Sequence, residues 1–226
     1  MIKLDGPVAR PRRGSEKRQA ITRGARTVFG RDGYAGASVD AIAAEAEVST
    51  RTIYNHFHDK EELFSCVIQE SAVQVRDALV EATRRHLDPV TDLEANLIAL
   101  ASDWVASMAR FPDHFALVRL ITAEANRFPA DVLDAWQELG PRAARAALAD
   151  HLARLAGQGL LDTDDANRAA NHFHLLAFAE VTERSHQGAV ALDEAVVAEI
   201  VTAGVRAFLR GYLPRSVVAR SASSAD

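Results

Sequence analysis

Apolar residues recur at helical spacing along nearly the whole chain, and this pattern constrains the fold more than any other feature of the sequence. They return every third or fourth residue, which places them on one face of an α-helix. No segment has the strict apolar and polar alternation, bounded by hairpin turns, that a half-buried strand requires. The pattern therefore predicts an all-α fold of about nine helices.

Capping and stop residues predict where the first helices begin and end. The first helix is expected to begin near Ser15, with Gly30 and Gly33 as stop signals. A second helix follows Ser38, and a third opens at Ser49, because serine hydroxyls accept hydrogen bonds from the free amides of a first helical turn. These helices are short and lie close together in the sequence.

A longer helix and five more follow. The fourth helix is expected to begin at Asp59, where Asp59 and Glu62 have the spacing of a reciprocal cap, and to run to about Arg85. Proline and glycine residues then divide the rest of the chain. The expected helices beyond Pro89 span residues 90–110, 112–126, 129–157, 164–187 and 193–212.

Charge is distributed unevenly along the chain. The net charge is −5, yet residues 1–60 carry 11 Lys and Arg against 7 Asp and Glu, while residues 61–226 carry 15 against 24. Only the N-terminal part is therefore suited to phosphate groups. A basic disordered tail is the simplest alternative explanation for Arg10, Arg12 and Arg13. We hypothesise instead that the segment containing these arginines enters the minor groove of DNA.

Composition indicates a cytoplasmic protein without cofactors. Cys66 is the single cysteine, so no intrachain disulfide forms, which suits a reducing compartment. The basic, polar N-terminus is unlike a signal peptide, and no apolar run is long enough for a membrane span. We therefore expect a soluble protein with no membrane partner. Its expected parts are a flexible basic arm (1–14), a small helical domain (15–60), a larger helical domain (61–213) and a disordered tail (214–226).

The second and third helices have the organisation of a DNA-reading helix-turn-helix. Two short helices are joined by a tight turn, and the second is rich in polar residues. With Ile53 turned inward, Arg51 and Asn55 point the opposite way, flanked by Thr52 and Tyr54. Arginine pairs with guanine edges and asparagine with adenine, whereas hydroxyl groups and lysine suit phosphates.

These pairings give a set of DNA-binding candidates. They are Ser38, Thr50, Arg51, Thr52, Tyr54, Asn55, His56 and Lys60. The alternative is a packed helical hairpin whose polar face is merely solvated. Packing of Tyr54 against the turn, and partial burial of His56, also remain open.

The run SVDAIAAEAEVSTRTIYNHFHDKEELF, residues 38–64, closely resembles the N-terminal signature of the TetR family. The likeness includes the Ile-Tyr-x-x-Phe stretch and the Lys-Glu-x-Leu-Phe that follows, and it extends back over ITRGARTVFGRDGYAGAS. Two residues depart from the family pattern, since Glu47 and Arg51 stand where glycine is usual. A left-handed backbone at Glu47 is expected to cost about 1 kcal/mol.

The resemblance implies a ligand-responsive repressor. Members of the family act as homodimers that place two reading helices in successive major grooves of a near-palindromic, double-stranded operator. Residues 90–213, with the string FPDHFALVRLITAEANRFPADVLDAWQELGP, more faintly resemble the C-terminal domain of AefR-like members. This likeness implies a cavity for a small-molecule effector, whose entry releases DNA. It makes residues 61–213 the expected ligand-binding and dimerisation domain, after a helix-turn-helix domain over residues 15–60. The effector's identity and the operator sequence stay open, as does activation instead of repression.

Broad apolar faces on the last two helices suit a dimer interface of four helices. The alternative is burial of both faces within one subunit. The residues on these faces are Ala169, His172, Phe173, Leu176 and Ala177, followed by Val196, Val197, Ile200, Val201, Val205 and Phe208.

Residues that an ordinary core would not choose are the candidates for the effector cavity. Arg119 suits an anionic ligand, with surface pairing to Glu124 or a neighbouring carboxylate as the alternative. For the two tryptophans, the alternative is plain core. His172 and His174 are two residues apart and therefore point about 200° apart around a helix, so they cannot easily bind one metal ion. We therefore predict no metal site. The candidates are Trp104, Met108, Phe115, Arg119, Trp136, His172, His174 and Phe178.

No motif indicates an enzyme. The sequence lacks a glycine-rich phosphate loop, zinc-ligand spacing and a Gly-x-Ser-x-Gly elbow. Cys66 lies among Phe64, Val67 and Ile68, where a buried, unreactive thiol is the ordinary outcome. A further alternative is a helical scaffold that keeps the fold without binding DNA, and the polar residues of the third helix argue against it.

Overall fold

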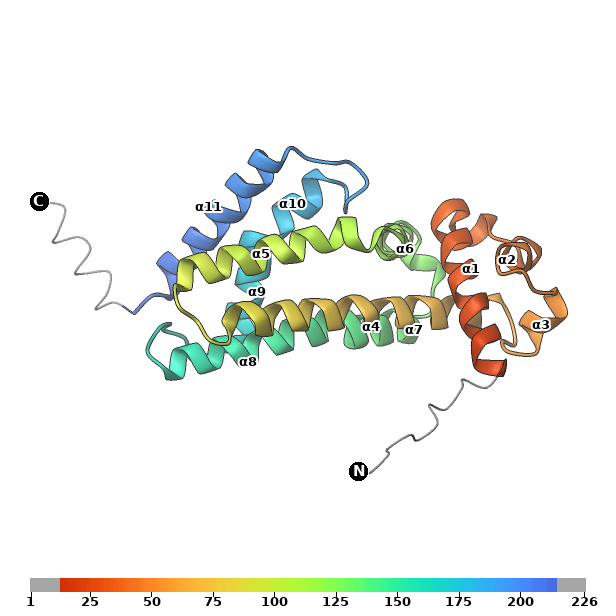
Figure 1. Ribbon diagram of the computed structural model, residues 1–226, viewed down its shortest axis with the longest axis horizontal. Helices are drawn as coiled ribbons and strands as arrows, with labels where there is room; N and C mark the ends of the chain where they lie inside the picture. The colour runs from red at the N-terminus through yellow and green to blue at the C-terminus, as the bar shows by residue number, and fades with distance from the viewer. Residues whose placement is uncertain (1–12, 215–226) are drawn as a thin grey trace, which may run out of the picture. The chain divides into compact units, whose positions relative to one another are not determined.

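The computed structural model describes residues 13–214, and every regular element there is a helix (Figure 1). The prediction of an all-α fold is confirmed for this part of the chain. The predicted arm and tail lie outside the described residues, apart from residues 13 and 14, which belong to the first helix, and residue 214. The chain divides into two compact units, residues 1–68 and 69–226. Their described parts are called the headpiece (13–68) and the C-terminal unit (69–214).

The headpiece is built from three helices and the start of a fourth. These are α1 (Arg13–Gly36), α2 (Val39–Glu45), α3 (Thr50–Tyr54) and the first part of α4 (Lys60–Leu87). The first helix does not stop at Gly30 as predicted. It is kinked at Gly33, where φ is 73° and ψ is 171°, and it continues to Gly36. Glycine tolerates this positive φ, so the predicted stop signal produces a kink.

The predicted helix caps are present. Ser38, Ser49 and Asp59 each accept a hydrogen bond from the amide three residues later, at 3.1, 3.1 and 2.8 Å. The carboxylate of Glu62 accepts a hydrogen bond at 2.6 Å from the backbone amide of His58, one residue before Asp59, so the return bond of the predicted reciprocal cap is shifted by one residue. Local side-chain chemistry therefore defines where three of the four helices begin.

Aromatic and aliphatic side chains form the headpiece core. The ring centroids of Phe29 and Phe64 lie 5.0 Å apart, and Tyr34 lies 5.0 Å from Phe64. Ile53 and Phe57 are buried in the same unit, with 1% and 2% of their surface exposed. Because the inner side of α3 is held in this way, its other side is turned away from the core.

The C-terminal unit contains the rest of α4 and the remaining helices. None of the helices within residues 13–214 has both the length and the apolar character needed to cross a bilayer. The remaining elements are α5 (Leu93–Arg110), α6 (Pro112–Ala123), a 3₁₀ turn (Ala125–Arg127), α7 (Ala130–Gln137), a π-helical segment (Glu138–Arg142), α8 (Ala143–Gly157), α9 (Ala166–Ala177), α10 (Ala179–Arg184) and α11 (Glu194–Tyr212).

Two predicted helices are divided in the structure. The expected helix over 129–157 contains the π-helical segment between α7 and α8, where Pro141 lacks the amide that a regular helical turn needs. The expected helix over 164–187 is interrupted at Phe178, whose φ is −126°, and continues as α10. Both interruptions place side chains against the same cavity.

Helices α9 and α11 cross at close range inside the C-terminal unit. A Cβ atom at Gly204 on α11 would overlap the backbone carbonyl of Leu176 on α9. The rings of Phe173 and Phe208 meet edge to face beside this crossing, with centroids 5.4 Å apart. Helix α9 also packs against α8, and α5 packs against α11. The glycine thus permits two helix backbones to touch where a side chain would separate them.

The apolar faces predicted to form a dimer interface are mostly buried within the single chain. This corrects the prediction for seven residues, each no more than 7% exposed because they pack in the core of the C-terminal unit: Ala169, Phe173, Ala177, Ile200, Val201, Val205 and Phe208. Val196 and Val197 are half-buried, and His172 is exposed. The large apolar side chains left exposed on α9 are Leu175 (53%) and Leu176 (41%).

Candidate functional sites

The turn between α2 and α3 is tight and includes a residue with positive φ. Glu47 has a φ of 53°, so the left-handed backbone expected at this position is present. The amide of Val48 donates to the Ala43 carbonyl at 2.9 Å, which closes the end of α2. A Cβ atom at Gly24 on α1 would lie 2.9 Å from the Ala46 nitrogen, so α1 and the turn are in close contact. These contacts fix the angle at which α3 leaves the turn.

Helix α3 turns its polar residues outward. Arg51 and Asn55 are exposed, and Tyr54 exposes 57% of its surface. More than half of the Tyr54 surface is therefore open to solvent. Thr50 and Thr52 on this helix, and His56 just after it, are half-buried. The Thr52 hydroxyl lies 2.8 Å from the Ser49 hydroxyl, so these two side chains also support the cap.

Ser38 and Lys60, the two candidates away from α3, have structural partners of their own. The exposed Ser38 hydroxyl caps α2 through the amide of Ala41. The Lys60 ammonium donates to the backbone carbonyls of Tyr34 and Ala37, at 2.9 and 3.1 Å, and lies 4.5 Å from the centre of the Tyr34 ring. Since an ammonium has three N–H groups, one remains for a phosphate. Lys60 is thus also a brace within the headpiece, which sequence reasoning did not anticipate.

Arg18 on α1 makes two contacts within the headpiece. Its guanidinium carbon lies 4.5 Å from the centre of the Phe57 ring, and Nη2 donates to the Cys66 sulfur at 2.9 Å. Arg23 is exposed. The positive charge of Arg18 therefore supports packing in the headpiece, since an arginine over an aromatic face is attracted to it.

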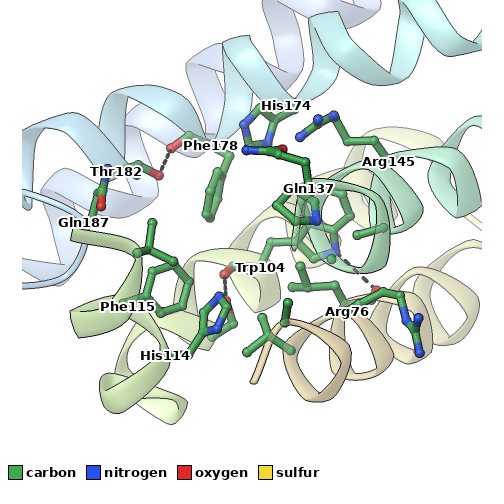
Figure 2. A pocket seen from close by; sticks show the side chains of 18 of the residues that line it. Arg76, Trp104, His114, Phe115, Gln137, Arg145, His174, Phe178, Thr182 and Gln187 are labelled. Carbon is green, nitrogen blue, oxygen red and sulfur yellow. Dashed lines mark hydrogen bonds between the residues drawn. The ribbon is translucent and has the colours of Figure 1, made fainter. Parts of the chain in front are cut away.

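The C-terminal unit encloses a cavity of about 230 Å³ (Figure 2). Its wall is mostly apolar and aromatic, with polar groups at separate places. Residues come from α4 to α10, from the π-helical segment and from the loop that follows α10. The lining residues are Ala72, Val75, Arg76, Leu79, Trp104, Ser107, His114, Phe115, Val118, Trp136, Gln137, Gly140, Pro141, Ala144, Arg145, His174, Phe178, Thr182 and Gln187.

Five of the eight predicted cavity residues line this space. They come from five places in the chain, and four of them are aromatic rings of tryptophan or phenylalanine. Trp104 lies between α4 and α9, where its indole nitrogen donates to the Leu79 carbonyl at 3.4 Å. The predicted residues that the structure brings together are Trp104, Phe115, Trp136, His174 and Phe178.

The other three predicted cavity residues lie outside the wall. The Arg119 guanidinium donates to the backbone carbonyl of Gln187 at 2.8 Å, whereas Glu124 pairs with Arg127 at 3.1 Å. His172 is exposed, and its Nδ1 lies 2.7 Å from the Tyr212 hydroxyl. Met108 is buried in the core of the unit. Each of these three side chains makes a contact with a residue distant in the sequence, which the local sequence does not predict.

His114 and Gln187 are among the polar groups of the cavity wall that sequence reasoning missed. His114 is buried, and its Nδ1 lies 2.9 Å from the Ser71 hydroxyl. The Oε1 atom of Gln187 is buried without a hydrogen-bond partner among the described residues. A buried amide oxygen without a donor costs free energy, so this atom favours a ligand that supplies one.

The charged groups of the wall are two arginines, and they differ in their pairing. Arg76 is paired with Asp77 at 2.6 Å and also donates to the Leu139 carbonyl at 3.2 Å. Arg145 makes neither a hydrogen bond nor an ion pair with any residue between 13 and 214. Burial, followed by the nearby charge of Arg142, lowers the pKa of Arg145.

His174 lies beside Arg145 and is neutral near pH 7. Burial, and then the positive charge of Arg145, lower the pKa of His174 to about 4. Figure 2 shows both side chains together with Gln137 at one end of the cavity, while Gln187 and Thr182 lie at the opposite end. Sequence reasoning missed Arg145, because only tertiary packing brings this arginine of α8 to the cavity.

Comparison with known families identifies both units. Residues 21–67 match the model described as bacterial regulatory proteins, tetR family, and residues 95–214 match that of the AefR-like transcriptional repressor, C-terminal domain. This chain belongs to the TetR family. The resemblance found in residues 38–64 is thus confirmed, as is the fainter one in residues 90–213. A TetR-family chain is a transcriptional regulator and not an enzyme.

Solved structures of TetR-family regulators are similar over most of the chain. A TetR-family transcriptional regulator from Mesorhizobium loti is 31% identical, covers 90% of this chain and 100% of its own, and has a TM-score of 0.82. The flavonoid-responsive regulator FrrA is 30% identical, with 89% of this chain and 99% of its own covered and a TM-score of 0.68. The likeness therefore includes both the headpiece and the C-terminal unit.

Among curated proteins, the similarity is confined to a shorter stretch. The HTH-type transcriptional repressor AcnR of Corynebacterium diphtheriae is 37% identical over 67 residues, which are 30% of this chain and 35% of AcnR. The chain therefore matches about a third of the length of this relative. AcnR of Corynebacterium glutamicum is similar to the same extent, with 36% identity over 67 residues.

Proposed function

We propose that this TetR-family regulator is a repressor that binds a near-palindromic operator as a homodimer and leaves it when a small-molecule effector binds. The observation that carries the proposal is the exposure of Arg51 and Tyr54 on α3 and of its C-cap Asn55, while Ile53 is buried. A short helix held in this way has the geometry of a reading helix in a major groove.

Each polar group of α3 has a chemical role in the proposal. The Arg51 guanidinium reads a guanine edge and the Asn55 amide an adenine edge. Tyr54, Thr50 and Thr52 contact phosphates or a thymine methyl group, and His56 lies at the end of the same face. Ser38 and the remaining N–H of Lys60 bind backbone phosphates. These contacts give both register and sequence preference.

The exposed apolar side chains of α9 support a dimer. Leu175 and Leu176 expose 53% and 41% of their surface on a helix whose other side is buried. On the neighbouring α11, Ala203 and Ala207 are exposed one helical turn apart. A second copy of the same surface covers these groups in a two-fold interface. The dimer then presents two reading helices to one operator.

The cavity of the C-terminal unit supports a role for an effector. It is enclosed by helices from both ends of this unit, including α4, which also contributes to the headpiece. An effector releases DNA only if it binds the non-binding conformation more tightly than the DNA-binding one. FrrA, a solved relative, is described as flavonoid-responsive, and this supports control by a small molecule here.

Selection of duplexes from a random library tests the proposed DNA binding. The full-length chain is incubated with the library, and bound duplexes are amplified and sequenced over several rounds. We expect enrichment of a near-palindromic sequence whose affinity falls as the salt concentration rises. A library that stays random would contradict the proposal and would favour a helical scaffold that has lost DNA binding.

A further inference from the structure

We infer that the effector is a small hydroxylated aromatic carboxylate, whose acid group binds Arg145 and whose hydroxyl donates to Gln187. This inference rests on the proposed function, since it names the class of ligand that the cavity accepts. It is carried by three observations on the cavity wall: an unpaired cation, an unpaired acceptor and the aromatic surface between them.

The cation is the first observation. Among the described residues, no Asp or Glu lines the cavity, and the two charged lining residues are Arg76 and Arg145. Asp77 pairs with Arg76, whereas Arg145 has no partner of opposite charge within residues 13–214. A half-buried guanidinium without a counter-ion is unfavourable, and a carboxylate satisfies it through two parallel hydrogen bonds.

The groups around Arg145 suit a carboxylate more than a phosphate. His174 is neutral near pH 7 because burial and Arg145 lower its pKa to about 4, so it adds a hydrogen bond without adding charge. The Gln137 amide lies at the same end of the cavity (Figure 2). Arg142, the last residue of the π-helical segment, already forms ion pairs with Asp134 and Glu138 at 2.8 and 2.7 Å. One positive charge is thus available, which matches a monoanion.

The acceptor is the second observation. Oε1 of Gln187 is buried at the other end of the cavity and accepts no hydrogen bond from any described residue. The Thr182 hydroxyl beside it already donates to the Phe178 carbonyl at 3.0 Å. A ligand hydroxyl that donates to Gln187 removes the cost of the unpaired oxygen. The two ends of the cavity therefore require opposite chemistry in one molecule.

Shape is the third observation. Four aromatic rings line the space between the two polar ends, and flat rings pack well against such surfaces. The volume of about 230 Å³ is below the roughly 300–1,000 Å³ of pockets that hold drug-sized ligands, so the cavity suits a small ligand with one ring and a short side chain. The four rings are those of Trp104, Phe115, Trp136 and Phe178.

The chain's own tryptophans report on binding. Trp104 and Trp136 are its two tryptophans, and both line the cavity. Intrinsic fluorescence of the full-length protein is titrated with 3-(4-hydroxyphenyl)propanoate, its methyl ester, 3-phenylpropanoate and octanoate. We expect the hydroxylated acid to bind about 10- to 100-fold more tightly than the ester, which lacks the charge. We also expect it to bind more tightly than 3-phenylpropanoate or octanoate.

Variants assign the preference to Arg145. Arg145→Gln is expected to bring the affinities for acid and ester within about twofold, and Arg145→Lys to retain a preference for the acid. Arg154→Gln, at an exposed arginine on the same helix, is the matched control and keeps the wild-type preference. Circular dichroism and the melting temperature show whether each variant is folded.

Two results would overturn the inference. One is the absence of any fluorescence change with the hydroxylated acid up to millimolar concentration. The other is an acid preference that survives in folded Arg145→Gln. DNA binding is measured separately without any acid, so a protein that binds its duplex but no acid contradicts the inference alone. A protein that binds the acid but enriches no duplex contradicts the proposed function.

Discussion

Gly204 on α11 lies so close to Leu176 on α9 that a Cβ atom at position 204 would overlap the Leu176 carbonyl oxygen. The obstacle is backbone, which cannot rotate away as a flexible side chain would. The substitution Gly204→Ala is therefore expected to lower the free energy of unfolding by about 1–3 kcal/mol, the usual cost of overpacking. Chemical denaturation of the full-length protein measures this change.

Gly211→Ala is the matched control for this prediction. Gly211 lies on the same helix and is exposed, and no atom of the described residues lies within 4 Å of where its Cβ would be. Alanine in place of a helical glycine is expected to raise stability by about 0.5–1 kcal/mol. Equal effects of the two substitutions would contradict the close crossing of α9 and α11.

Glu47 carries the positive φ of the turn in the helix-turn-helix. Replacement by glycine relieves the steric cost of the left-handed backbone, partly offset by the greater freedom of glycine in the unfolded chain. Glu47→Gly is expected to stabilise the headpiece by up to about 1 kcal/mol. Glu45→Gly removes the same charge from helix α2 and is expected to cost about 1 kcal/mol.

Hydrogen exchange of the α2 and α3 amides in the full-length protein distinguishes the two glutamate variants. Slower exchange in Glu47→Gly and faster exchange in Glu45→Gly are expected, because exchange reports local opening. Faster exchange in both variants would show that the Glu47 side chain stabilises the turn by more than its backbone strain costs.

The exposed leucines of α9 are predicted to hold the dimer together. The double variant Leu175→Glu and Leu176→Glu places two carboxylates on this surface. In a two-fold dimer they would be buried against the same carboxylates of the second copy, so we expect monomers at micromolar concentration. Leu160→Glu, at another exposed leucine outside α9, is the control and should remain dimeric. Sedimentation equilibrium gives the mass, and a dimer in the double variant would rule out this interface.

His174 is predicted to make the protein less stable in mild acid. Its pKa of about 4 in the folded state lies below the ordinary value of 6.5, so the unfolded chain binds more protons between these values. The contribution to stability is complete above pH 6.5, decreases as the pH falls to 4, and amounts to about 2 kcal/mol between pH 7 and pH 5.

Denaturation of wild type and His174→Gln at both pH values isolates this contribution. The variant is expected to lose less stability in acid than the wild type, because glutamine does not titrate. His186→Gln removes an exposed histidine and controls for the loss of a histidine as such. An identical loss in His174→Gln and wild type would contradict the burial of the imidazole.

Much of the headpiece was predictable because its determinants are local. Caps at Ser38, Ser49 and Asp59 act within three residues, and the positive φ of Glu47 follows from its place in the turn. The division of the helix over 129–157 was not predicted, because the π-helical segment also depends on the packing of Gly140 against Ala72 on α4, a contact across the fold.

The cavity was predictable only where residue type alone gave a signal. Large aromatic residues such as Trp104 and Trp136 were found in its wall as expected. Arg119 and Arg145 are both arginines on partly apolar helices, and only tertiary structure shows that the first meets a backbone carbonyl while the second faces the cavity. In the same way, only tertiary structure shows that Val201 and Val205 are buried within one chain and do not form a dimer interface.

Binding of the enriched duplex by variants of α3 tests the central claim most directly. Fluorescence anisotropy at fixed salt is expected to give a Kd for Arg51→Ala at least about 10-fold above that of the wild type, the usual cost of losing a base contact. Tyr54→Ala is expected to weaken binding as well, and Arg154→Ala, outside the headpiece, should bind as the wild type does. Wild-type affinity in both Arg51→Ala and Tyr54→Ala would contradict the assignment of α3 as the reading helix.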